Sequence, residues 1–276
     1  MSKEKVLICV KTYPTLSEKY DELVCTAGVK EDGSWIRIYP VPFRKLNYDK
    51  QYRKWQWIEL DLTRNTKDLR PESYRPNLDA PFSLLNIIGT NRQWAERKRY
   101  VLRDVKTNMD ELIAEAKDPS KRTSLAILKP SKVIDFIYEP CAEEWDKTKL
   151  EAIKANQDQL DLFVQEEVAT IFKIAQKIPY KFSYVFETED GKRRTLMIED
   201  WEIGMLYLNS LEAADGDETV ACKKVKEKYF DYFVNNTDLY FFVGTTKKFH
   251  NISPNPFIII GTFYPPKQIE EYPSLF

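Results

Sequence analysis

Residues 20–44, YDELVCTAGVKEDGSWIRIYPVPFR, hold the pattern that decides the first part of the fold. The run 22–29 is apolar and β-prone, and the EDG sequence after it suits a tight turn because glycine adopts a positive φ without strain. From 34 to 39, apolar residues alternate with bulkier polar or aromatic ones, the period of two that a strand requires. The stretch predicts a β-hairpin, ended by Pro40 and Pro42 because proline cannot donate a hydrogen bond to a sheet.

The second strand of this hairpin has two different faces. Ile36 and Ile38 lie on one face, and Trp35, Arg37 and Tyr39 lie on the other. Two aromatic rings beside a guanidinium group can stack a nucleobase and hold a phosphate, so this face is a candidate nucleic-acid-binding surface. The alternative is that the aromatic residues form a second apolar layer and that Arg37 pairs with a carboxylate.

Further aromatic and basic residues in the same region fit this function. Residues 55–62, WQWIELDL, predict another strand whose more polar face carries two tryptophans. Residues 63–81 lack an apolar period and contain DLRPESYRP, which is typical of a long loop whose arginines grip an anion. The alternative for this loop is a surface excursion whose arginines pair with Asp68 and Glu72. The candidate nucleic-acid-binding residues are Trp35, Arg37, Arg44, Trp55, Trp57, Arg70, Arg75 and the loop histidine His250.

Length and charge limit the class of protein. The chain has 276 residues and a net charge of −1, which is enough for two modest domains. It has no apolar run of the length a membrane span needs and no signal-peptide pattern, so we expect a cytoplasmic protein. Residues 1–130 carry 25 Lys and Arg against 18 Asp and Glu, whereas residues 131–276 carry 17 against 25. This asymmetry predicts either an anionic partner for the first half or docking of one half on the other.

Few features of the sequence point to catalysis. The four cysteines show no CxxC or Cys/His spacing, and the chain has one histidine and no glycine-rich phosphate loop. Glu199, Asp200 and Glu202 form the only tight acidic cluster, which could hold a divalent ion in a hydrolase or nuclease. Helix capping and docking between domains are the alternative roles of these residues. The catalytic residues, if any exist, stay unassigned.

The second half repeats the plan of the first. Residues 180–198 predict another hairpin with an Asp-Gly turn, and two apolar strands are expected at 239–244 and 257–264. Asn108 is a candidate N-cap. Helices are expected over 91–105, 109–117, 201–211 and 218–235, with a helical connector over 141–163. We place one basic domain at 1–130 and one acidic domain at 131–276.

Several short motifs also carry a resemblance to a known group. At VCTAG, GSWIRIYPVPFR and RPESY, the chain resembles a broad set of poorly characterised bacterial and archaeal proteins with dual OB-fold domains. IEDWEIG and DLYFFVGT look like the second half of that architecture. The resemblance implies two small β-barrels with inserted helices, nucleic-acid recognition, and a mobile-element or defence context, but no reaction. Relatives carry extra Cys and His residues before the DWE segment that this chain lacks, which puts a metal site in doubt.

These patterns together predict an α+β, mainly β protein with two small OB-like or PUA-like barrels and helical insertions. The expected function is non-catalytic binding of a nucleic acid or nucleotide by the basic, aromatic face of the first domain, without a cofactor or metal. Two alternatives stay open. One is a metal-dependent hydrolase or nuclease that uses the acidic cluster, and the other is an interaction protein whose oppositely charged halves form a homo-oligomer or dock a partner.

Overall fold

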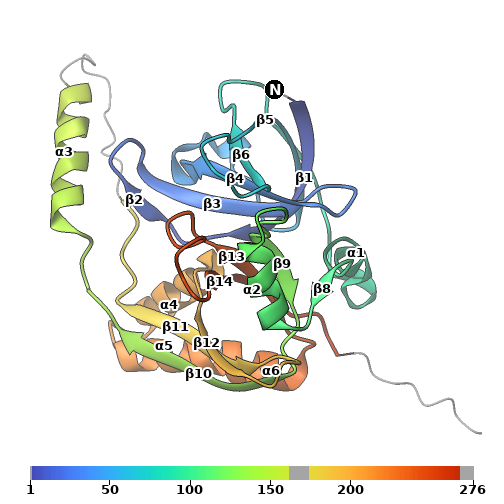
Figure 1. The fold of residues 1–276 in the computed structure, drawn as a ribbon. Coiled ribbons are helices and arrows are strands. Elements are labelled where there is room, and N and C mark those ends of the chain that lie inside the picture. Colours follow the sequence, from blue (N-terminus) through green and yellow to red (C-terminus); the bar gives the residue numbers. More distant parts are fainter. Residues whose placement is uncertain (1, 162–173, 268–276) are drawn as a thin grey trace, which may run out of the picture.

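The computed structural model describes residues 2–161 and 174–267, which form two successive halves (Figure 1). We call residues 2–103 the barrel half, because they build a closed β-barrel, and residues 105–267 the sheet half, because they build two smaller sheets. Helices pack mainly on the sheet half (Figure 1). The structure is therefore α+β and mainly β, as the sequence predicts.

Five strands close the barrel. The strands of this half are β1 (Ser2–Lys11), β2 (Thr15–Ser17), β3 (Asp21–Val29), β4 (Trp35–Val41), β5 (Gln56–Arg64), β6 (Ser73–Pro76) and β7 (Ser83–Ile87). β1 pairs with both β3 and β5, so the order β1-β3-β4-β6-β5 returns to β1. The β4–β6 pair is parallel and the other four pairs are antiparallel. Closure matters because it pairs the edges that an open sheet would expose.

The hairpin predicted from residues 20–44 is present as β3 and β4. Gly33 in its turn has a φ of 88°, the left-handed conformation that glycine allows. β4 continues to Val41, so the prediction that Pro40 ends the strand is wrong. Tyr39 and Pro40 together oppose the single residue Cys25, and this bulge tolerates a residue without an N–H to donate.

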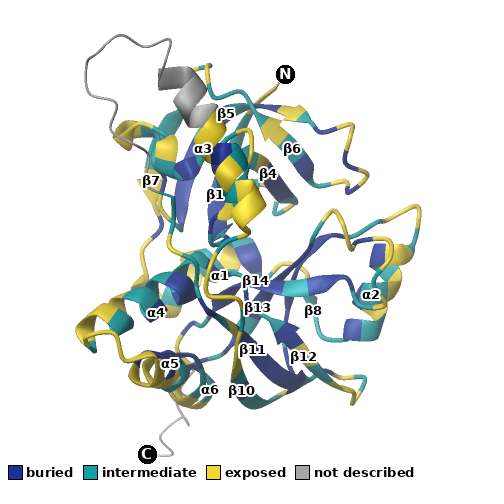
Figure 2. Cartoon of the chain, turned by 90° about the vertical axis from the view of Figure 1, so that its left-hand side faces the viewer, coloured by how far each residue is buried: buried dark blue, intermediate teal, exposed yellow. Residues whose placement is uncertain are grey.

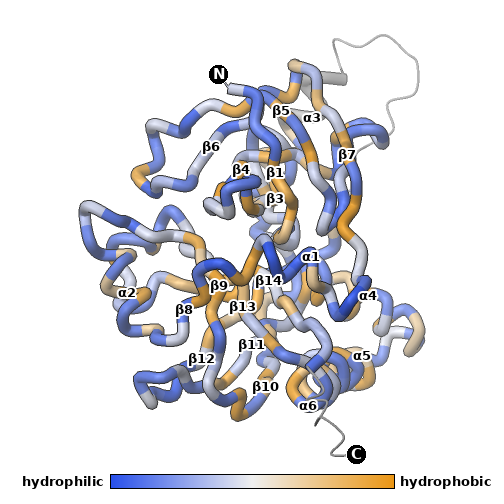
Figure 3. The backbone as a smooth tube through the Cα atoms, turned by 90° about the vertical axis from the view of Figure 1, so that its right-hand side faces the viewer, coloured by the Kyte–Doolittle hydropathy of each residue, from blue (hydrophilic) through white to orange (hydrophobic). Residues whose placement is uncertain are grey.

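Alternation along the barrel strands separates two apolar clusters. Side chains such as Ile36 and Ile58 fill the barrel interior. Side chains on the outer face, such as Trp55, pack instead against Phe242 and Phe263 of the sheet half. Figure 2 shows dark blue, buried strands in both halves, and Figure 3 shows hydrophobic segments of β1, β9 and β13 close to where the halves meet. The junction is therefore a second apolar core.

The sheet half holds two sheets with the orders β10-β11-β12 and β14-β13-β9-β8. A bridge between Ile198 and Ile259 joins them. The strands are β8 (Val105–Lys106), β9 (Leu125–Leu128), β10 (Lys132–Pro140), β11 (Tyr180–Glu187), β12 (Arg193–Met197), β13 (Tyr240–Thr245) and β14 (Phe257–Phe263). β8 and β9 precede residue 131 in the chain but pair within this half.

Most of the helices form where the sequence predicts them. Asn108 caps α2 by accepting hydrogen bonds from the backbone N of Asp110 and Glu111, at 3.0 and 3.2 Å. The helical elements are the short 3-10 turns η1 (Phe43–Lys45) and η2 (Tyr48–Lys50), the helices α1 (Asn91–Val101), α2 (Met109–Lys117), α3 (Lys147–Asp161), α4 (Trp201–Ala213) and α5 (Glu218–Lys226), the π-helical turn η3 (Glu227–Tyr232) and α6 (Phe233–Asn236). The last two positions of the predicted connector lie outside the described residues. No helix in the described ranges has the length and apolar character to cross a membrane.

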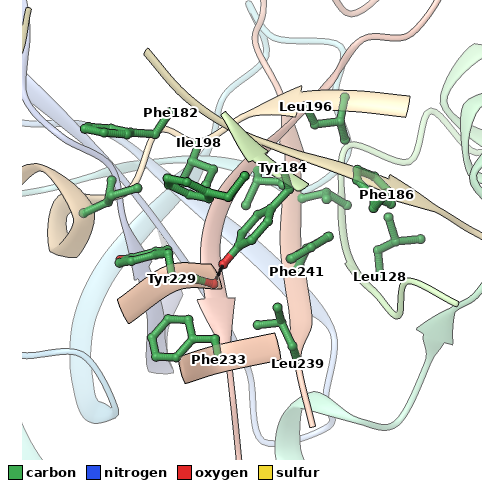
Figure 4. Packing of buried hydrophobic residues seen from close by; sticks show 14 of the residues in the cluster. Leu128, Phe182, Tyr184, Phe186, Leu196, Ile198, Tyr229, Phe233, Leu239 and Phe241 are labelled. Carbon is green, nitrogen blue, oxygen red and sulfur yellow. Dashed lines mark hydrogen bonds between the residues drawn. The ribbon is translucent and has the colours of Figure 1, made fainter. Parts of the chain in front are cut away.

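An aromatic core holds the sheet half together (Figure 4). The rings of Tyr184 and Phe241 stack 4.8 Å apart, and Phe186 meets Phe241 edge-on. The hydroxyl of Tyr184 donates to the carbonyl oxygen of Tyr229, so this buried polar group is satisfied (Figure 4). The core thereby fixes β11 and β13 against the helical segment that contains η3.

Candidate functional site

The barrel face that the sequence marks as a binding surface packs against the sheet half. Trp55 and Trp57 are only 6% and 3% exposed, and the ring of Trp35 lies 5.7 Å from the ring of Phe242. All three belong to the cluster that joins the halves. They form the second apolar layer that was the alternative interpretation, because the outward face of a barrel strand gains stability when another apolar layer covers it.

Arg37 and Arg70 connect the two halves from within this junction. Arg37 donates to the hydroxyl and the carbonyl oxygen of Ser124, at 2.8 and 3.0 Å. Arg70 donates twice to the carboxylate of Asp68, at 2.9 and 2.6 Å, and once to the carbonyl oxygen of Thr245. The two arginines are 3% and 6% exposed. Their donors therefore serve internal docking, since a buried guanidinium group needs acceptors on every side.

His250 lies beside these arginines rather than in a solvated loop. It is 2% exposed, and its Nδ1 is 2.9 Å from the hydroxyl oxygen of Thr245. Burial lowers the pKa of His250, and the nearby Arg70 and Arg37 guanidinium groups lower it further. The structure thus brings three predicted site residues together around Thr245.

The remaining predicted residues lie apart from this group. Arg44 donates to the carboxylate of Glu22 at 2.8 Å, and Arg75 is exposed on β6. Of the eight residues predicted to bind nucleic acid, Arg75 is exposed and the other seven are buried or half-buried. An open surface that combines these aromatic and basic side chains is not present in this conformation.

The predicted acidic cluster lies where the sheet half meets the barrel. Asp200 is the N-cap of α4 and accepts a hydrogen bond from the backbone N of Glu202 at 3.3 Å. The carboxylate of Glu202 pairs with Lys54 of the barrel half at 2.7 Å. Helix capping and docking of the two halves, the alternative roles predicted for this cluster, are both confirmed. The structure describes no group of three or more His, Cys, Asp or Glu side chains in residues 2–161 and 174–267 that could hold a metal ion.

A pocket of about 260 Å³ opens beside the acidic cluster, with walls from both halves. Tyr13 comes from the segment before β2, and Trp145 and Tyr180 come from the sheet half. Glu199 and Asp200 line the pocket together, although neighbouring strand residues point in opposite directions. They do so because β12 ends at residue 197 and the chain turns into α4.

Close packing of α4 shapes one wall of this pocket. A Cβ atom on Gly204 would lie 2.4 Å from Cδ2 of Tyr13, so glycine is what lets the helix and the ring approach. The Tyr13 hydroxyl donates to the carbonyl oxygen of Gln176 at 2.6 Å. The indole N–H of Trp145 donates to the carbonyl oxygen of the neighbouring Ala175 at 2.8 Å. Both rings are therefore held by hydrogen bonds to the same segment.

The two carboxyl groups in the pocket have unusual titration properties. Burial raises the pKa of Glu199. Burial also raises the pKa of Asp200 to about 7, against the opposing influence of Lys54. Oδ2 of Asp200 has no hydrogen-bond partner among the described residues. A carboxyl group that is partly protonated near pH 7 can both donate and accept a hydrogen bond, or transfer a proton.

Sequence reasoning found the carboxylates of this pocket but not its aromatic walls. Tyr13, Trp145 and Tyr180 are separated by more than 30 residues from one another and share no motif. The available signal was the IEDWE sequence, in which two acidic residues directly follow an apolar strand. Only the packing of the halves shows which side chains from elsewhere in the chain face them.

Comparisons with known proteins agree with a two-domain organisation. One family model, described as a domain of unknown function (DUF8758), matches residues 2–103, and a second, described as a domain of unknown function (DUF8757), matches residues 105–276. The expectation of two adjacent, poorly characterised domains is confirmed. No curated protein matches the chain.

Solved structures give only a distant likeness. A murine DNA-binding protein bound to double-stranded DNA is 8% identical, with 98% of each chain covered and a TM-score of 0.32. A score this low supports no conclusion about fold or function. The second family model spans more than half of the chain, and the protein therefore belongs to the DUF8757 family, with a DUF8758 domain preceding that domain.

Proposed function

We propose that the protein binds a nucleotide, or a single base of a nucleic acid, in the pocket between its two halves. The observation that carries this proposal is the meeting of aromatic rings and two raised-pKa carboxyl groups in one pocket of about 260 Å³. At roughly 30 Å³ per water molecule, this volume equals about nine waters, which leaves room for a heteroaromatic ring.

The chemistry of the pocket matches a nucleobase in two ways. Tyr13, Trp145 and Tyr180 supply flat apolar surfaces, and stacking of a base on an aromatic side chain contributes about 1–3 kcal/mol. Asp200 supplies a group that donates as well as accepts, and Glu199 supplies acceptor oxygens, as the polar edge of a base requires. Two lysines also line the pocket, Lys177 and Lys181, and they suit the phosphate of a nucleotide.

The topology of the barrel supports the same class of ligand. Its strand order and its single parallel pair resemble those of an OB-fold, a five-stranded Greek-key barrel that often binds oligonucleotides. The sheet half has a link between its two sheets, because the backbone N of Glu189, in the turn between β11 and β12, donates to the carbonyl oxygen of Thr107 next to β8. We infer an OB-like barrel followed by a strongly curved, barrel-like sheet half.

Binding of nucleosides, nucleotides and short single-stranded DNA and RNA, measured by calorimetry on the full chain, tests the proposal. We expect at least one of these ligands to bind, and replacing Tyr13 by Ala to weaken its affinity about 5- to 150-fold, equivalent to about 1–3 kcal/mol. Ile203→Trp, which fills the pocket, is expected to abolish binding, because Ile203 is a buried residue of the pocket wall.

Two further variants separate the pocket from the surface first marked by the sequence. Asp200→Asn keeps a neutral donor and acceptor, so it should retain affinity at pH 6 and remove the decline in affinity that we expect for the wild type above pH 7. Arg75→Ala changes the exposed predicted residue and should leave affinity unchanged. If no ligand binds, or if Arg75→Ala removes binding while Ile203→Trp does not, the pocket is not the nucleotide site.

A metal-dependent hydrolase is the alternative that the same assay examines. For a divalent ion to use this cluster, Asp200 would have to leave its helix-capping bond and Glu202 its ion pair with Lys54. Turnover of a bound nucleotide or oligonucleotide that requires Mg²⁺ and disappears in Glu202→Gln would favour the hydrolase over the binding protein.

A further inference from the structure

A second cavity lies on the other side of Asp200 from the nucleotide pocket. Its volume is about 180 Å³, equal to roughly six water molecules. The barrel half contributes all of its basic side chains, and the start of α4 contributes the rest. The lining residues are Lys11, Arg53, Lys54, Asp200, Trp201 and Glu202.

Lys11 has an exceptional environment for a lysine. Its ammonium group lies 4.3 Å from the ring centroid of Phe43 and 5.2 Å from that of Trp201. Its hydrogen bond to the carbonyl oxygen of Tyr52 is long, at 3.4 Å, and no described carboxylate forms an ion pair with it. An ammonium group has three donors, so this cation keeps donors free toward the cavity.

The charges around the cavity do not cancel. Lys54 is compensated by Glu202 at 2.7 Å. Asp200 is the remaining acidic residue of the lining, and burial makes it partly neutral near pH 7 by raising its pKa to about 7. Lys11 and Arg53 are therefore left with at most a partial counter-charge. A cavity with surplus positive charge and unused N–H donors complements an oxyanion.

We infer that this second cavity is a binding site for a small tetrahedral oxyanion of the phosphate type, held by Lys11 and Arg53 with Lys54 behind them. The anion would complete the hydrogen bonding of Lys11, and the protonated carboxyl group of Asp200 would act as an additional donor. Inorganic phosphate and a terminal phosphate group of a larger molecule share this chemistry, and the test below distinguishes them.

The site has a predictable dependence on pH. Burial lowers the pKa of Lys11 to about 8, so above that pH the cation is progressively lost. Above about pH 7, Asp200 becomes negative and repels an anion. Both changes weaken anion binding as the pH rises from 6.5 to 8.5. Lys11, Lys54, Asp200 and Glu202 influence one another electrostatically. Other titratable groups that interact with members of this set include Tyr229, Tyr264, Arg97 and Lys228.

Titration of the full chain with inorganic phosphate, followed by calorimetry and by ³¹P NMR, tests the inference. We expect saturable phosphate binding at pH 6.5, and we expect sulfate, whose charge does not change between pH 6.5 and 8.5, to bind more weakly at pH 8.5 than at pH 6.5. Lys11→Met and Arg53→Gln should each weaken binding roughly tenfold or more, since each removes a charge-assisted hydrogen bond. Arg53 is exposed, so its variant is expected to fold even if Lys11→Met does not.

A matched control is available in the same half. Lys19 also lies over an aromatic ring, at 5.1 Å from the centroid of Tyr20, but it is exposed and outside the cavity. Lys19→Met should leave phosphate binding unchanged. Absence of saturable binding by the wild type, or equal affinity of the wild type and Arg53→Gln, would overturn the inference.

The source of the phosphate group is resolved by comparing inorganic phosphate with pyrophosphate and a nucleoside monophosphate. Tighter binding of inorganic phosphate assigns the free ion, and tighter binding of the larger molecules assigns a terminal phosphate group. Of these two cavities, Ile203 lines the nucleotide pocket and not the second cavity, whereas Lys11 lines the second cavity and not the nucleotide pocket. Ile203→Trp should therefore leave inorganic phosphate binding intact, so the two sites can fail independently.

Discussion

Replacing Arg70 by Met should reveal how strongly the buried arginines hold the protein together. Arg70 and Asp68 have side-chain exposures of 7% and 5% and share two hydrogen bonds, and Arg70 also donates to Thr245 across the junction. The variant leaves the Asp68 carboxylate buried without its cation, which costs about 3–5 kcal/mol. At about 2–4 °C per kcal/mol for a chain of this size, the Tm should fall by about 6–20 °C.

The dependence of this loss on pH provides a second readout. Burial alone would raise the pKa of Asp68, but hydrogen bonds from Arg70 and Ser73 hold it well below its usual range. Because the pKa of Asp68 is lower in the folded than in the unfolded protein, its carboxylate stabilises the fold above about pH 4, and this stabilisation is lost as the pH falls further. In Arg70→Met, protonation at low pH neutralises the buried Asp68 carboxylate and removes the cost of its unpaired charge. The difference in the free energy of unfolding between the wild type and the variant should therefore be largest near pH 7 and become smaller toward pH 4.

Urea unfolding at pH 7 and pH 4, followed by circular dichroism, measures both effects. Arg75→Met is the matched control, because Arg75 is exposed on β6 and its replacement should change the free energy of unfolding by less than about 0.5 kcal/mol. The reasoning is refuted if the free energy of unfolding of Arg70→Met at pH 7 is within about 1 kcal/mol of the wild-type value. It is also refuted if the difference between these two free energies is the same at pH 7 and pH 4.

Three further changes test other parts of the structure. Gly204→Ala places a Cβ 2.4 Å from Tyr13, so it should push the ring into the nucleotide pocket and weaken ligand binding measured by calorimetry, whereas Gly89→Ala, which meets nothing within 4 Å, should not. Lys54→Met removes the cation that lowers the pKa of Asp200, so the carboxyl group should titrate above pH 7, as followed by infrared or NMR spectroscopy; an unchanged or lower value contradicts this. Asn108→Ala removes the cap of α2 and should cost about 1 kcal/mol in urea unfolding, while Asn108→Asp, which keeps an acceptor, should cost less.

The local elements of this fold could be predicted because each depends on neighbouring residues. The hairpin of β3 and β4 follows from alternation and from Gly33, and the start of α2 follows from Asn108. The start of α1 is different, since Arg92, Gln93 and Trp94 adopt φ values of 50°, 53° and 64°. Side chains other than glycine rarely adopt this conformation, so the surrounding structure must impose it.

The candidate sites show a similar division. The sequence identifies Glu199 and Asp200 as an acidic cluster and predicts that oppositely charged halves can dock. It does not show that Trp55 is covered by the sheet half, because an aromatic residue on the second face of a strand is compatible with stacking a ligand or packing on a domain. The choice between these roles is made by residues such as Phe242, almost 200 positions further along the chain.

By itself, the amino-acid sequence determined most of the strands, most of the helix boundaries, the charge difference between the halves and the mainly β character, because periodicity, turn residues and caps act over a few positions. It did not determine β6, which lies in the stretch 63–81 predicted as a loop and which pairs only because the closing barrel brings β4 and β5 beside it. Only the tertiary structure decided that Arg37, Arg70 and His250 are internal, and that Tyr13 and Asp200 share a pocket. The physical reason is burial. Whether a guanidinium group meets water or a carbonyl oxygen, and whether a carboxyl group keeps its proton near pH 7, depends on which distant surfaces exclude water from it.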